Sequence, residues 1–227
     1  MVDKFFPSIA AALSEVKDNS VVMVGGFGTI GQPNALLEGL IEQGARDLTL
    51  IANNAGSGHV GLARILELGR VRKIICSFPR GSDPVVFEQL YRAGKLELEI
   101  VPQGTLAERI RAAGAGVPAF YTPTGVGTVL GRNKEVREIN GRPCLLEHAL
   151  HADLALIESW RADRWGNLTY RKSGRNFNPI MAMAADLTVV QTQGVCALGE
   201  IDPETVVTPC IFVDRVVHVP YGNPVIL

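Results

Sequence analysis

The sequence predicts an α/β protein built on an open, mostly parallel sheet with helices on both faces and a β-rich C-terminal part. Three observations predict this fold. Short apolar runs alternate with helix-like stretches four times between residues 20 and 113. Turns marked by glycine or proline separate each run from the helix that follows it. After residue 131, hairpin signals and further apolar runs replace the helices.

The first half of the chain predicts four strands, each followed by a helix. The strands are expected at residues 21–24, 48–52, 71–76 and 96–101, and the helices at residues 33–43, 60–68, 84–93 and 106–113. In the first helix, four apolar residues form one face, namely Leu36, Leu37, Leu40 and Ile41. Pro33 suits the first turn, because proline lacks the amide proton that this position leaves unpaired.

The second half predicts mainly strands. Asn140-Gly141 lies between apolar runs at residues 136–139 and 143–146, which is a strong hairpin signal. Further strands are expected at residues 153–160, 168–171, 187–193 and 212–219. No low-complexity linker separates the two halves, so residues 1–227 are expected to form a single domain.

Composition excludes several classes of function. The net charge is −1, which argues against nucleic acid or an acidic membrane surface as the partner. No apolar run approaches the roughly 20 residues of a membrane span, and residues 1–17 lack a signal-peptide pattern. The cysteines are widely spaced and are expected to be free thiols of a cytoplasmic protein: Cys76, Cys144, Cys196 and Cys210.

Ligands of open parallel sheets bind at the carboxyl ends of the strands, so four loops are expected to form the site. These loops are residues 25–31, 53–58, 77–83 and 102–104. The first contains a G-x-G-x-x-G pattern, which suggests a dinucleotide site in an oxidoreductase. The acid that should end the second strand of such a site is replaced by Asn53-Asn54, which weakens that reading. Backbone amides at a helix N-terminus still suit an anion, with a simple tight turn as the alternative.

Other catalytic patterns are weak. There is no G-x-S-x-G motif, and none of the 14 glutamates lies in a glycine-flanked loop at a strand end. His148 and His151 are three residues apart and are interpreted as a surface pair, so no metal site is expected. Residues 161–177 carry five basic side chains, which suit an anion, a partner contact or a solvated face equally well.

Five segments together resemble the alpha subunits of the family I coenzyme A transferases. They are residues 18–33, 53–56, 102–109, 119–125 and 163–167. The resemblance implies a two-step mechanism in which a glutamate attacks an acyl-CoA and then carries coenzyme A as a thioester. In the family this glutamate lies in a Ser-Glu-Asn-Gly motif of the beta subunit, and no such motif is present here. The chain is therefore expected to work with a beta subunit, in a heterodimer or heterotetramer, and to be inactive alone.

The resemblance also assigns site residues. Gln103 matches a glutamine whose amide stabilises the oxyanion, with a turn amide as the structural alternative. The loop expected to bind coenzyme A consists of Gly25, Gly26, Phe27, Gly28, Thr29, Ile30 and Gly31. Substrate binding is expected at Asn53, Asn54, Arg80 and Gly104. No permanently bound cofactor is expected, since the coenzyme A thioester is a substrate.

Residues 77–83 resemble the members of the family that act on 3-oxoadipate more than those that act on acetoacetate. Arg80 is expected to clamp the second carboxylate of 3-oxoadipate, although a plain surface arginine is an equal alternative. Succinyl-CoA is the expected donor. Acetoacetate as acceptor, a dinucleotide-binding oxidoreductase and a non-catalytic CoA-binding module remain the alternatives.

Overall fold

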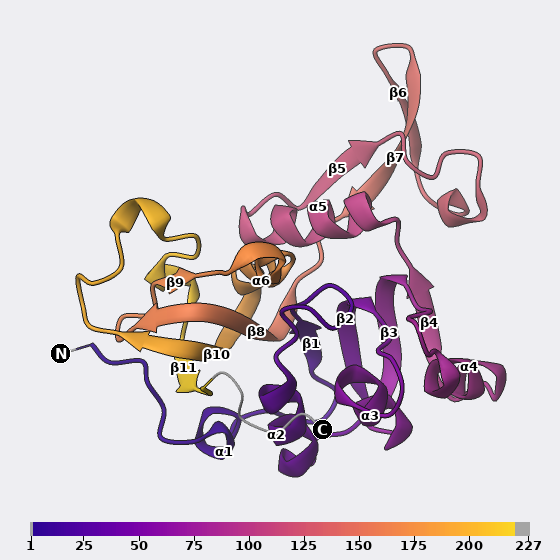
Figure 1. Ribbon diagram of the computed structural model, residues 1–227. Coiled ribbons are helices and arrows are strands. Elements are labelled where there is room, and N and C mark those ends of the chain that lie inside the picture. The colour runs from indigo at the N-terminus through magenta and orange to yellow at the C-terminus, as the bar shows by residue number, and fades with distance from the viewer. Residues whose placement is uncertain (1, 221–227) are drawn as a thin grey trace.

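An eight-stranded sheet runs through the computed structural model, which describes residues 2–220 (Figure 1). Its strands are β1 (Val21–Val24), β2 (Leu48–Asn54), β3 (Val71–Phe78), β4 (Glu97–Ile100), β8 (Ala152–Asp163), β9 (Leu168–Thr169), β10 (Ala185–Cys196) and β11 (Arg215–His218). They lie in the order β11-β10-β8-β1-β2-β3-β4, with β9 beside β8. All neighbours are parallel except β8 and β9. The predicted open, mostly parallel sheet is confirmed.

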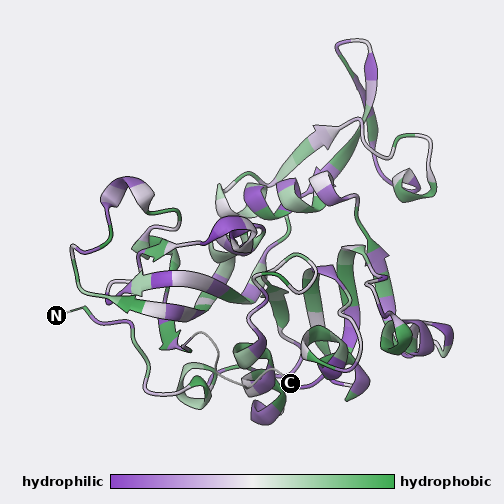
Figure 2. Cartoon of the chain, in the orientation of Figure 1, coloured by the Kyte–Doolittle hydropathy of each residue, from purple (hydrophilic) through white to green (hydrophobic). Residues whose placement is uncertain are grey.

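Helices cover both faces of this sheet, as predicted. They are α1 (Ile9–Ala12), α2 (Asn34–Gln43), α3 (Gly61–Glu67), α4 (Val85–Arg92), α5 (Gln103–Gly114) and α6 (Asn178–Ala182), with short 3₁₀ turns η1 (Val129–Gly131), η2 (Lys172–Arg175), η3 (Pro203–Thr205) and η4 (Cys210–Phe212). Val22 and Val24 of β1 belong to the apolar cluster that includes α1 to α4, whereas Met23 belongs to the cluster that includes α5 and α6. This alternation follows from the period of two along a strand. In Figure 2, α5 alternates between hydrophilic and hydrophobic residues, as an amphipathic helix does.

A second, three-stranded antiparallel sheet projects from the main body (Figure 1). It consists of β5 (Ala119–Thr122), β6 (Val136–Ile139) and β7 (Arg142–His148), in the order β5-β7-β6. Asn140 and Gly141 join β6 to β7 with φ angles of 50° and 72°, so both adopt the left-handed conformation of a type I′ hairpin turn. The predicted hairpin is confirmed. The strand β5 was not predicted, because its four half-buried residues show no alternation of apolar and polar side chains.

The order of the strands places a topological switch between β1 and β8. The chain proceeds from β1 outward to β4, then returns to the other side of β1 and continues with β8, β10 and β11. Loops that follow the two strands of a switch turn away from one another and leave a crevice where ligands bind. The C-terminal strands thus extend the same sheet that the N-terminal half begins.

The observed boundaries of α5 and β11 differ from the prediction. The helix expected at residues 106–113 already begins at Gln103, so Gln103 and Gly104 open α5 instead of lying in a loop. Gly104 and Thr105, which are weak helix formers, concealed this start. The strand expected at residues 212–219 covers only β11, because residues 210–212 form η4.

Over the described residues, no helix combines the length and apolar character needed to cross a membrane.

Candidate active site at the carboxyl ends of the strands

Hydrogen bonds join the ends of β2, β3 and the start of α5. The Asn53 side-chain amide donates to Gln103 Oε1 at 2.9 Å and to Ser77 Oγ at 3.2 Å. Its oxygen accepts from the backbone amide of Gly28 at 3.4 Å. Asn53 is 5% exposed, so its hydrogen bonds are largely shielded from solvent. Ser77, which the sequence did not single out, thus belongs to a cluster with three predicted site residues, and a serine at the end of the third predicted strand was the available signal.

Gln103 presents a hydrogen-bond donor to solvent. Its Oε1 accepts from Asn53 and also lies 3.2 Å from Ser77 Oγ, while none of the hydrogen bonds found within residues 2–220 uses its Nε2. The side chain is exposed and opens α5, where the helix N-terminus adds positive potential. A cavity of about 390 Å³ lies beside it, lined also by Phe27 and Asn176. An amide held by its oxygen is suited to stabilise negative charge that develops on a bound group.

Two asparagines fix the position of loop 25–31 through hydrogen bonds to its backbone. Asn176 accepts from the Gly26 amide at 3.1 Å, and Asn178 donates to the Gly31 carbonyl at 3.0 Å. Gly31 has a φ of +67°, and a Cβ atom there would lie 2.7 Å from the Gly174 carbonyl oxygen. The close approach that Gly31 permits is therefore to Gly174 of the same chain. A Cβ atom at Gly28 would meet nothing within 4 Å, so Gly28 is the glycine that faces open space.

A cavity of about 300 Å³ lies between this loop and the end of β2. Gly28, Thr29, Asn53 and Asn54 are among the residues that line it. Asn54 donates to the Gly28 carbonyl at 3.4 Å and accepts from the Gly56 amide at 2.7 Å. Asn54 therefore orders two of the predicted loops around the cavity. The structure brings the predicted residues of loops 25–31, 53–58 and 102–104 together at one edge of the sheet.

Arg80 lies apart from this cluster. Its side chain is 64% exposed and forms an ion pair with Glu88 of α4, with Nε and Oε1 3.1 Å apart. Gly81 and Ser82 line the 300 Å³ cavity, and Arg80 is not among its lining residues. An exposed ion pair holds its partners weakly, so Arg80 is free to exchange its carboxylate partner. Its role as a clamp for a second carboxylate stays a prediction.

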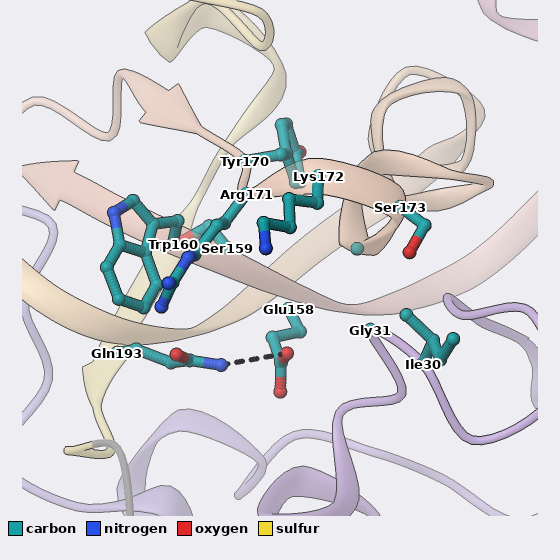
Figure 3. A pocket seen from close by; sticks show the side chains of 11 residues that line it. Ile30, Gly31, Glu158, Ser159, Trp160, Tyr170, Arg171, Lys172, Ser173 and Gln193 are labelled. Carbon is teal, nitrogen blue, oxygen red and sulfur yellow. Dashed lines mark hydrogen bonds between the residues drawn. The ribbon is translucent and has the colours of Figure 1, made fainter.

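Glu158 of β8 is a candidate residue that the sequence analysis did not identify. It faces a cavity of about 240 Å³ at the switch between β1 and β8 (Figure 3). Its carboxyl oxygens accept from Gln191 Nε2 at 2.8 Å and from Gln193 Nε2 at 3.0 Å. Burial raises the pKa of the Glu158 carboxyl, and the two glutamine amides partly oppose this shift. An acidic residue within a predicted apolar strand was the signal, but only strand pairing brings the glutamines beside it.

The remaining candidates resolve into structural roles. Asp163 accepts from the backbone amides of Trp165 and Asn167, at 2.9 and 3.0 Å, and so shapes a turn. His151 lies 3.8 Å from the exposed carboxylate of Asp186. No cluster of three or more metal-ligating side chains was found in the part of the chain that the structure describes. The four cysteines are unpaired, and burial raises the pKa of Cys76 to about 12, which keeps that thiol protonated.

Comparisons with known proteins show to which family the chain is related. A family model described as coenzyme A transferase matches residues 6–219. The chain is 61% identical to the alpha subunit of the 3-oxoadipate CoA-transferase of Pseudomonas putida, over 96% of this chain and 95% of that protein. It is 49% identical to the alpha subunit of a succinyl-CoA:3-ketoacid coenzyme A transferase of Xanthomonas campestris, over 92% of this chain and 85% of that one.

A solved structure shows the same fold. The acyl-CoA transferase of Escherichia coli O157:H7, solved as a thioester complex with CoA, superposes with a TM-score of 0.83 at 20% identity. The superposition covers 97% of this chain and 49% of that chain. Since both the family model and the relatives span nearly the whole sequence, the chain belongs to the coenzyme A transferase family.

Proposed function

We propose that this chain is the alpha subunit of a heteromeric CoA-transferase that moves coenzyme A from succinyl-CoA to 3-oxoadipate. The name of the Pseudomonas putida relative supports this substrate, since 61% identity extends over 96% of the chain. The observation that carries the mechanism is the Gln103 amide, anchored through its oxygen by Asn53 at the edge of a cavity. Residues 1–227 would act as one domain in the cytoplasm, with the main sheet shared between both halves of the chain.

The reaction proceeds through a glutamate of the partner subunit. Its carboxylate attacks the acyl carbonyl of succinyl-CoA, and the C–S bond breaks to give an anhydride and the CoA thiolate. The thiolate attacks the glutamyl carbonyl of that anhydride, which releases succinate and leaves CoA on the glutamate as a thioester. 3-Oxoadipate then takes the CoA by the same two steps in reverse. Each attack places negative charge on a carbonyl oxygen, and the Gln103 Nε2 protons would stabilise that charge.

The described residues support a nucleophile supplied from elsewhere. Strand β2 ends in Asn53-Asn54, which are neutral amides. Glu158 is the acid found beside loop 25–31, and both of its oxygens are engaged by glutamines. The E. coli relative is about twice as long as the part that this chain matches, which leaves room there for a second half. A partner subunit of that kind would bring the glutamate to Gln103.

Loop 25–31 would bind the acyl-CoA through Gly28 and the exposed side chains of Phe27 and Ile30. Asn53, Asn54 and Gly104 would contact the acid substrate at the cavities beside them. Arg80 would bind the second carboxylate of 3-oxoadipate by leaving Glu88. Coenzyme A enters and leaves as a substrate in this scheme, and no permanently bound cofactor takes part.

The test is to purify the chain alone and together with a partner that contains a Ser-Glu-Asn-Gly glutamate. We expect CoA transfer from succinyl-CoA to 3-oxoadipate with both subunits and none with this chain alone. Transfer by the chain alone, or none by the pair, would contradict the proposal. The Xanthomonas relative favours a second candidate acceptor, acetoacetate, so kcat/KM for both acids decides between them. Binding of CoA without any transfer would instead indicate a non-catalytic module.

A further inference from the structure

The cavity beside Glu158 lies at the topological switch of the sheet, next to loop 25–31 but apart from Gln103 and Asn53. Gly31 follows β1, and Glu158 belongs to the neighbouring strand β8, so the cavity occupies the crevice where open sheets bind ligands. Its volume is about 240 Å³. At about 30 Å³ per water molecule, this space holds a ligand fragment of several heavy atoms instead of one solvent molecule.

The floor of the cavity is a hydrogen-bond acceptor with a set position. Gln191 and Gln193 each donate to one carboxyl oxygen of Glu158. The Gln191 oxygen in turn accepts from the backbone amides of Ala35 and Leu36, at 3.0 and 3.3 Å, in the first turn of α2. A carboxylate has about four acceptor positions, so each oxygen of Glu158 can accept a further hydrogen bond from a ligand.

The opposite wall carries a donor. Figure 3 shows Lys172 reaching into the cavity from the side facing Glu158. Lys172 and Glu158 both line the cavity, and none of the ion pairs found in residues 2–220 joins them. The neighbouring Arg171 stacks on Trp160, with its guanidinium 4.7 Å from the ring centroid, and forms a side wall.

The backbone at Lys172 is unusual. Its φ is +49°, a conformation that disfavours side chains other than those of asparagine and aspartate. The other non-glycine residues with positive φ in the described chain are of these two types: Asn19, Asp47, Asn133 and Asn140. A lysine kept in this conformation beside a cavity points to a functional placement of its side chain.

The polar groups select the chemistry of the ligand. A free carboxylate or phosphate would accept from Lys172 but would face the acidic side chain of Glu158, whereas an amide offers both a donor and an acceptor. Trp160 and Ile30 supply apolar walls for the carbon chain around such an amide. We propose that this cavity binds an amide of the pantetheine arm of acyl-CoA, with Glu158 accepting from its N–H and Lys172 donating to its carbonyl. This inference rests on the proposed function, because loop 25–31 forms one side of the cavity.

The experiment compares three succinyl thioesters as substrates of the complex with its partner subunit. These are succinyl-CoA, succinyl-pantetheine, and the thioester of a simple alkyl thiol that contains no amide. Glu158→Gln and Lys172→Met are compared with Glu204→Gln and Lys95→Met, which change exposed side chains of the same types. For the first two thioesters we expect each site variant to raise KM about tenfold, as the loss of one charge-assisted hydrogen bond does. For the amide-free thioester, kcat/KM should stay within about twofold of the wild-type value.

Three outcomes would overturn this inference. They are an unchanged KM for succinyl-pantetheine, an equal loss with all three thioesters, and loss of partner binding in the variants, which would mean that the partner chain fills the cavity. Lys172 is exposed, so Lys172→Met keeps the test valid even if Glu158→Gln disturbs folding. Absence of transfer by the wild-type complex would instead contradict the proposed function itself.

Discussion

Replacing Asn178 by alanine tests how loop 25–31 is held. Asn178 is fully buried. Its oxygen accepts from the Glu158 amide at 3.0 Å, and its nitrogen donates to the carbonyls of Gly31 and Gly174 at 3.0 and 2.9 Å. Each buried hydrogen bond contributes about 1 kcal/mol, and each group left unpaired adds to the cost, so Asn178→Ala should destabilise the protein by about 3 kcal/mol or more. For a chain of this length, that loss lowers Tm by about 6–12 °C.

The assay is thermal unfolding, at one fixed protein concentration, of the complex with its partner subunit, because association also affects Tm. The control is Gln89→Ala, which removes an exposed amide of α4 and should change stability by less than about 0.5 kcal/mol. If Asn178→Ala and Gln89→Ala unfold within about 2 °C of one another, as roughly 1 kcal/mol would give, the reasoning that Asn178 anchors the loop is refuted.

Three further predictions follow from the site. Gln103→Ala should lower kcat about 100-fold with little change in KM, because the amide would act on the transition state. Steady-state kinetics measures both constants, and an unchanged kcat would contradict this role. Gly31→Ala should lower the free energy of unfolding by about 1 kcal/mol or more, because its φ is +67° and its Cβ atom would crowd Gly174. Denaturant unfolding measures this loss, and Gly116→Ala is the control that separates backbone strain from crowding. Burial raises the folded-state pKa of Glu158, so ionisation there disfavours the folded state. Glu158→Gln should therefore gain stability relative to wild type as pH rises from about 4 to about 8, and a difference independent of pH would exclude this cause.

Most of the main sheet was predictable from local patterns. The run at residues 21–24 is apolar because both faces of β1 are covered by helices, and such runs are distinct from the alternating strands of half-exposed sheets. The hairpin at Asn140-Gly141 was equally clear, since both residues tolerate positive φ. The helix start at Gln103 was missed, because Gly104 and Thr105 carry little local preference for a helix.

The site was predictable only where it depends on strand ends. Loop 25–31 and Asn53 were found because each follows a predicted parallel strand, and parallel strands end at the same edge. Asn176 and Asn178 escaped notice, since about 150 residues separate them from the loop that they hold. The free hydrogen-bond donor of Gln103 depends on which atom its neighbours engage, and no pattern in a sequence records that.

The sequence by itself determined the alternation of strands and helices, the sheet edge that carries the site and the resemblance to one family, because these depend on neighbouring residues. Only the tertiary structure decided that β8 lies beside β1 and that Gln191 and Gln193 hold Glu158. It also showed that Gly31 approaches Gly174 of the same chain, whereas Gly28 faces open space. These contacts join residues from 33 to 143 positions apart. Packing of the whole chain brings such residues together, and local propensity does not.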